Sequence, residues 1–76
     1  MNPDTFPLRG EHITLEALIK AADLNGQREL ARAVIADGLV KVNGEVETRR
    51  GRKLRAGDVA QLGAAAVRVV DGDPEQ

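Results

Sequence analysis

The sequence contains no cysteine, tryptophan or tyrosine, and Phe6 is the only aromatic residue among 76. Without cysteine, the chain can form neither a disulfide framework nor a thiolate metal site. Without aromatic rings, it lacks the stacking platform by which proteins usually hold unstructured single-stranded nucleic acid. A chain this short buries only about 60% of the surface that its unfolded form exposes, so its small core must hold by packing alone.

Long apolar runs and catalytic motifs are missing as well. No stretch of apolar residues is long enough to cross a membrane, and no charged-then-apolar leader is present. We therefore expect a cytoplasmic protein without a membrane partner. G-x-S-x-G, P-loop and G-x-G-x-x-G motifs are absent, and His12 is the only histidine, so we expect it to have a surface role. The sequence thus predicts no enzymatic activity, no cofactor and no metal.

Proline occurs only near the two ends, at Pro3, Pro7 and Pro74. Chain ends of this composition are often loosely ordered. We therefore expect one domain over residues 11–70, flanked by flexible tails at residues 1–10 and 71–76.

Two helices are predicted in the first half of the chain. In "ITLEALIKAADL", Thr14 is a candidate N-cap, and the apolar residues that follow recur at helical spacing. "QRELARAVIA" repeats that spacing, and Gly38 follows as a glycine able to end the helix in a left-handed conformation. The apolar faces comprise Leu15, Leu18, Ile19 and Ala22 in the first helix, and Leu30, Ala31, Val34 and Ile35 in the second.

After Gly38 the pattern alternates, as in strands. "LVKV" and "EVET" flank Asn43-Gly44, the strongest short hairpin signal, while "VAQL" and "AAVRVV" are joined near Gly63. Asp58, in the turn "AGD", is expected to bond backbone amides. The order helix-helix-strand-strand-loop-strand-strand predicts an α+β domain, with two helices packed on one face of a small antiparallel sheet.

Positive charge is concentrated in one short segment of a slightly acidic chain. The net charge is −1 and the isoelectric point is about 5.7, yet residues 49–55 hold five cations. They are Arg49, Arg50, Arg52, Lys53 and Arg55. This distribution, and not the net charge, is what matters for a nucleic-acid partner. A solvated loop that only adds solubility is the plain alternative.

The stretch "RELARAVIADGLVKVNGEV" resembles the S-four RNA-binding domain, a family named after the fourth protein of the small ribosomal subunit. Its small stand-alone bacterial members are the nearest in size. The family usually begins its second helix with Ser-Arg-Ser or Ser-Arg-Thr, where this chain has Gln27-Arg28-Glu29. The matching residues are Arg28, Ala31, Arg32, Val34, Ile35, Gly38, Val40, Val42, Asn43, Gly44, Gly57, Asp58 and Val59.

The resemblance implies a non-enzymatic module that holds structured RNA, ribosomal or transfer RNA, with the ribosome or a ribosomal precursor as the larger partner. We expect a monomer. The expected RNA-contacting residues are Arg28, Arg32, Lys41, Arg49, Arg50, Arg52, Lys53 and Arg55. The alternative function is a protein-interaction module that docks an acidic partner through the same loop. Because the five like charges repel each other, we also expect replacement of Arg49, Arg50, Arg52 and Lys53 with serine to cost little stability.

Overall fold

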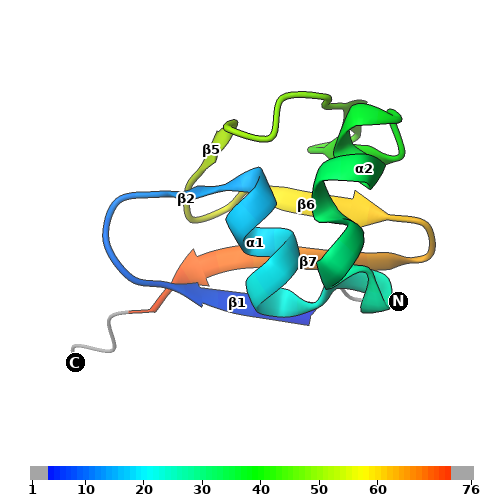
Figure 1. Cartoon of the computed structure of the whole chain (residues 1–76). Helices are drawn as coiled ribbons and strands as arrows, with labels where there is room; N and C mark the ends of the chain where they lie inside the picture. Colours follow the sequence, from blue (N-terminus) through cyan, green and yellow to red (C-terminus); the bar gives the residue numbers. More distant parts are fainter. Residues whose placement is uncertain (1–3, 73–76) are drawn as a thin grey trace.

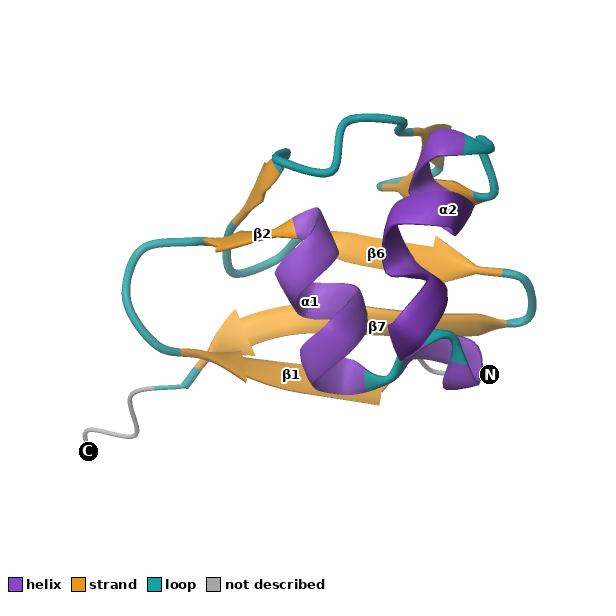
Figure 2. Cartoon of the chain, in the orientation of Figure 1, coloured by secondary structure: helices purple, strands orange, loops and turns teal. Residues whose placement is uncertain are grey.

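The computed structural model describes residues 4–72 and shows a layer of helices on one face of a mixed sheet (Figures 1 and 2). The α+β class and the two helices on one face are as predicted. The helices are α1 (Leu15–Ala22) and α2 (Ala31–Ala36), with single 3₁₀ turns η1 (Leu24–Gly26) and η2 (Arg28–Leu30) between them. No helix within residues 4–72 is long and apolar enough to span a membrane.

The main sheet has five strands in the order β1-β7-β6-β3-β4. These are β1 (Asp4–Leu8), β3 (Val40–Val42), β4 (Glu45–Val46), β6 (Val59–Leu62) and β7 (Ala65–Asp71). A separate two-stranded ladder joins β2 (Ile13–Thr14) to β5 (Lys53–Leu54). That ladder brings the end of the basic segment to the start of α1.

Local capping explains where the helices begin and end. The Thr14 hydroxyl accepts a hydrogen bond from the backbone N–H of Ala17 at 3.3 Å, so it is the N-cap that the sequence predicts. Gly38 has a φ of +76° directly after α2, as expected of a glycine that ends a helix. The regular helix α2 starts only at Ala31, because the preceding residues form a 3₁₀ turn.

The β3–β4 hairpin turns at Asn43 and Gly44, which both have positive φ, as a type I′ turn requires. The Asn43 side chain also ties this turn to the next hairpin. Its amide oxygen accepts from the Val59 N–H at 2.9 Å, and its nitrogen donates to Asp58 at 3.0 Å. The turn therefore fixes the position of β6 as well as that of β4.

The first strand corrects the prediction at the N-terminal end. Residues 4–8 do not belong to a flexible tail: they form β1, which pairs in parallel with β7, so the sheet is mixed and not purely antiparallel. Pro7 is compatible with this position because β1 is an edge strand, where a missing N–H leaves no gap in a ladder. Leu8 is buried in the core. Asp71, expected in the C-terminal tail, is the last residue of β7, and residues 1–3 and 73–76 lie outside the described range.

The core fills the space between the helices and the inner face of the sheet. Val40 and Val42 are buried while Lys41 between them is exposed, as strand alternation predicts. Leu54 is fully buried, so it pins the end of the basic segment to the domain. The largest fully buried side chains are Leu15, Leu18, Ile19, Ile35, Val40, Leu54 and Val69.

Candidate nucleic-acid interface

The basic segment, residues 49–55, is anchored by its backbone to the first turn of α1. The Leu15 N–H donates to the Arg52 carbonyl at 2.8 Å, and the Glu16 N–H donates to the Arg50 carbonyl at 3.0 Å. The first N–H groups of a helix have no partner within the helix, so these carbonyls satisfy donors that would otherwise need water or a capping side chain. The cations therefore project from a fixed platform and not from a free loop.

A buried carboxylate lies directly under this segment. Glu47 is only 7% exposed, and its Oε2 accepts from the Arg49 backbone N–H at 3.1 Å and from Arg49 Nε at 2.9 Å. Its Oε1 accepts from Arg49 Nη2 at 3.2 Å and from Arg52 Nη1 at 2.7 Å. Hydrogen bonds from Arg49, and next from Arg52, lower the pKa of Glu47 to about 2. Glu47 is therefore charged at neutral pH.

A second carboxylate, Glu16 on α1, joins three elements. Its Oε2 lies 2.9 Å from Lys20 Nζ and 2.9 Å from Arg32 Nε on α2, and its Oε1 lies 3.8 Å from Arg50 Nε. The bond from Lys20, and next that from Arg32, holds the pKa of Glu16 below its ordinary value. Glu16 thus brings Arg32 and Arg50, far apart in the sequence, to one place.

An open hollow lies on the basic segment, lined by Arg49, Gly51, Arg52 and Lys53. A guanidinium group has five N–H donors, and Glu47 uses two side-chain donors of Arg49 and one of Arg52. The other side-chain donors of these two arginines have no hydrogen-bond partner within residues 4–72, so they can bond a ligand. Lys53 is exposed and has no ion pair within residues 4–72. Three cations around one hollow form a site suited to a phosphate group.

Comparison with known proteins identifies the family. The S4 domain model matches residues 6–70 of this chain. The chain belongs to the S4 domain family. The Escherichia coli (strain K12) protein named "Putative RNA-binding protein YbcJ" is 37% identical over 67 residues, which cover 87% of this chain and 96% of that protein. The Bacillus subtilis (strain 168) protein named "Probable ribosome maturation protein RlbA" is 40% identical over 52 residues, 68% of this chain and 73% of that protein.

Two of the site residues predicted from the sequence, Lys41 and Arg28, do not lie with the cations of the basic segment. Lys41 lies on the sheet face opposite the helices, because its neighbours Val40 and Val42 face the core. Arg28 lies on η2, where its backbone N–H donates to the Asp23 carboxylate at 3.2 Å. The Arg28 side chain is exposed. It forms no ion pair with Glu16, unlike the other members of what we call the Glu16 cluster: Lys20, Arg32 and Arg50.

Arg55 is exposed just outside the hollow and has no ion pair within the described chain. Its backbone N–H donates to Asp58 at 2.8 Å, which makes Asp58 the turn residue that the sequence predicts. This bond, and next that from Asn43, lowers the pKa of Asp58 below its ordinary value. Arg55 therefore stands at the edge of an ordered turn.

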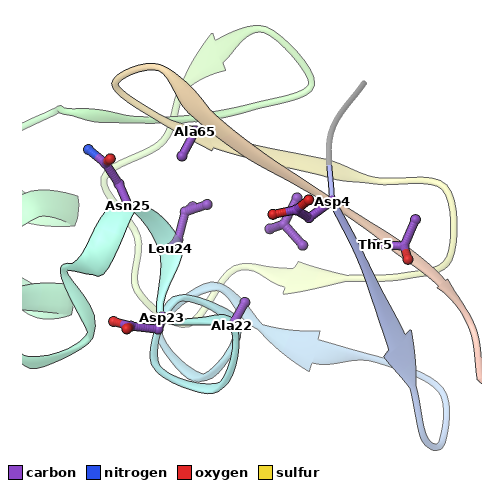
Figure 3. Close-up of a pocket in the computed structure, with 8 residues that line it drawn as sticks. Asp4, Thr5, Ala22, Asp23, Leu24, Asn25 and Ala65 are labelled. Atoms are coloured by element: carbon purple, nitrogen blue, oxygen red, sulfur yellow. The ribbon is translucent and has the colours of Figure 1, made fainter. Parts of the chain in front are cut away.

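A second pocket in the S4 domain includes no residue of the basic segment and lies between β1, β7 and the turn after α1 (Figure 3). Asp23 and Asn25 in that turn have φ of +47° and +54°, which short polar side chains tolerate. Acidic and small side chains line this pocket, so it does not extend the basic surface. The lining residues are Asp4, Thr5, Ala22, Asp23, Leu24, Asn25, Ala65 and Val67.

Sequence reasoning missed both carboxylates, Glu16 and Glu47. A usable signal for Glu47 is the two-residue turn, because it fixes the hairpin register. Val46 pairs with Lys41 and so shares its exposed face, with 57% of Val46 accessible. Glu47 then falls on the inner side, where its N–H bonds the Val40 carbonyl at 2.9 Å. For Glu16 we find no comparable signal.

Proposed function

We propose that this chain binds structured RNA, ribosomal or transfer RNA, through phosphate contacts from the basic segment, and that it catalyses no reaction. The observation that carries the proposal is the hollow lined by Arg49, Arg52 and Lys53. Membership of the S4 domain family supports it, as do the RNA-related names of the two relatives. Because the name of the Bacillus subtilis relative mentions ribosome maturation, we propose the ribosome or its precursor as the setting and the cytoplasm as the location.

The preference for folded RNA follows from the lack of rings. Phe6, the only aromatic residue, is partly buried against the core and offers no stacking platform. A single strand held without stacking keeps only its backbone contacts. A folded RNA, by contrast, presents phosphates and 2′-hydroxyl groups in a fixed arrangement that an ordered basic surface can match.

Arg32 and Arg50 extend the surface beyond the hollow. Both contact Glu16, so α2 and the basic segment present their cations side by side. Arg55, which is exposed, follows Lys53 along the segment and adds one more cation. We assign Arg28 and Lys41 a smaller share, because Arg28 lies outside the Glu16 cluster and Lys41 lies on the opposite face of the sheet. We expect the protein to act as a monomer.

Salt dependence tests the phosphate contacts. If four cations meet phosphates, log K for a structured RNA should fall with log salt at a slope of about −3 to −4. A folded hairpin should also compete better than a poly-pyrimidine strand. A flat salt dependence, or better competition by the single strand, would refute the proposal.

A pair of matched variants locates the contact. Lys53→Ser and Arg68→Ser each remove one exposed cation that has no ion pair within residues 4–72, but Arg68 lies on the sheet face away from the helices. Lys53→Ser should weaken RNA binding and make the slope of log K against log salt shallower by the amount of about one phosphate contact. Arg68→Ser should leave both the affinity and the slope unchanged.

The alternative is a module that docks an acidic protein through the same cations. A pull-down from nuclease-treated lysate separates the two functions, because an RNA-mediated complex is lost on treatment and a direct protein complex persists.

A further inference from the structure

Glu47 is an unexpected residue for an RNA-binding surface. It places a full negative charge under the cations that line the hollow, and a carboxylate there lowers the positive potential that attracts phosphate. On electrostatic grounds alone, the segment would bind RNA better without it. Its burial therefore calls for another role.

The contacts of Glu47 show what that role is. Its four hydrogen bonds come only from Arg49 and Arg52, and they fix both the backbone of Arg49 and the two guanidinium groups. Glu47 itself is held to the sheet by the bond from its N–H to the Val40 carbonyl. The orientation of the two arginines is thus set by the sheet, through a single carboxylate.

The orientation leaves the arginines open to a ligand. The Arg49 side chain is 75% exposed and that of Arg52 is 35% exposed, although both are bonded to a carboxylate that is itself buried. One edge of the Arg49 guanidinium faces Glu47, and its other N–H groups remain available. Such a fork can bond a carboxylate on one edge and a phosphate on another.

We propose that Glu47 is a positioning residue, which holds Arg49 and Arg52 at the hollow as a preformed seat for one RNA phosphate. The inference rests on the proposed function, since it assigns a role within that RNA-binding surface. Flexible arginine side chains lose freedom when they bind a phosphate, and a site ordered beforehand loses less. Glu47 thus lowers the electrostatic attraction of the segment for phosphate, but it orders the side chains of Arg49 and Arg52 before binding.

The test compares two neighbouring carboxylates. Glu47→Gln and Glu45→Gln each remove one negative charge from the same region, but Glu45 is exposed and bonds neither arginine. We expect Glu47→Gln to bind a structured RNA roughly tenfold more weakly than the parent, because two side chains must now be ordered on binding. Its salt slope should fall by about one contact, and its preference for the hairpin over the single strand should shrink. Glu45→Gln should bind as the parent does or slightly more tightly.

A measurement without RNA checks the positioning itself. In the ¹⁵N spectrum of the parent, the Nε–H of Arg49 should be protected from exchange with water, and Glu47→Gln should remove that protection. Arg49→Lys is a second variant that keeps both the charge of the segment and Glu47. It should also weaken binding, because an ammonium group cannot bond both oxygens of Glu47 and a phosphate as the guanidinium fork does. Melting curves ensure that all variants are folded at the temperature of the assay.

The outcomes separate this inference from the proposed function. If the parent binds no RNA, the proposed function fails and this inference fails with it. If the parent binds and Glu47→Gln binds equally well or more tightly, as Glu45→Gln does, only the positioning role is overturned. Arg49→Lys binding as tightly as the parent would overturn it too.

Discussion

Replacing Arg49 and Arg52 together with serine should destabilise the fold, although both side chains belong to a surface segment. The substitutions remove all three side-chain hydrogen bonds to Glu47, which is 7% exposed, and leave it only the bond from the backbone N–H of residue 49. Removing the partners of a buried charge costs more than losing an exposed ion pair. This outcome differs from the expectation, drawn from the sequence, that removing these cations costs little stability.

The magnitude follows from the pKa of Glu47. A pKa of about 2, against an ordinary value of 4.5, corresponds to a stabilisation of about 3 kcal/mol as an upper limit. Much of the Arg49 side chain lies in water, which screens the pair, so we expect a loss of about 1–2 kcal/mol. For a domain of this size, that loss lowers the melting temperature by roughly 4–15 °C.

The contribution of Glu47 to stability depends on pH, and it changes in opposite directions in the parent and in the variant. In the parent the pKa of Glu47 is depressed, so its contribution is present above about pH 4.5 and is lost as the pH falls towards 2. In the variant, burial raises the pKa of Glu47 by more than the remaining bond from the backbone N–H of residue 49 lowers it, so the charge of Glu47 destabilises the fold until acid protonates it. The difference in unfolding free energy between the two proteins should therefore be largest at pH 7 and should shrink towards pH 3.

Urea unfolding at pH 7 and pH 3, followed by circular dichroism, measures that difference. Arg50→Ser with Lys53→Ser is the matched control, because it removes two cations that Glu47 does not contact. The control should unfold nearly as the parent does. Adding Glu47→Gln to the Arg49 and Arg52 variant should restore part of the lost stability at pH 7. Equal stability of the variant and the parent, or a difference that does not shrink in acid, would refute the reasoning.

Two further predictions concern the fold and the second helix. Gly44→Val should lower the melting temperature markedly, because Gly44 has a φ of +88° and a β-branched side chain is strained there; an unchanged melt would contradict this. Arg28→Ser with Arg32→Ser should weaken binding to a structured RNA at fixed salt by less than the removal of the segment cations does, because fewer phosphate contacts are lost. A greater loss of affinity in the Arg28 and Arg32 double variant would contradict this prediction and would indicate that the interface is centred on η2 and α2.

The sequence predicted the elements whose signals are local. Thr14 marks the start of α1, Gly38 the end of α2, and Asn43 with Gly44 the hairpin turn, and each does so through its own backbone or capping chemistry. The resemblance to the S-four domain rested in part on Gly38, Asn43 and Gly44, and the family match confirms it. Elements of this kind need no knowledge of the rest of the chain.

Features that depend on distant partners were not predictable in this way. The strand β1 forms because β7, some sixty residues later, offers an edge for it, and its two apolar residues give no strand pattern of their own. Similarly, Glu16 meets Arg32 and Arg50 only because α2 and the basic segment pack beside α1. The charge count of the segment was evident from the sequence, but its pairing was a property of the fold.

The two carboxylates change how the basic segment should be understood. Five adjacent cations on a free loop would spread apart and meet a phosphate backbone in many arrangements. Here Glu47 orients Arg49 and Arg52, while the Arg50 and Arg52 carbonyls bond the start of α1. Glu47 therefore neutralises part of the positive charge of the segment, while the hydrogen bonds fix its geometry. If the segment binds RNA as we propose, this arrangement weakens its attraction to polyanions in general and favours an RNA whose phosphates match the fixed geometry. Selectivity would then not require aromatic rings.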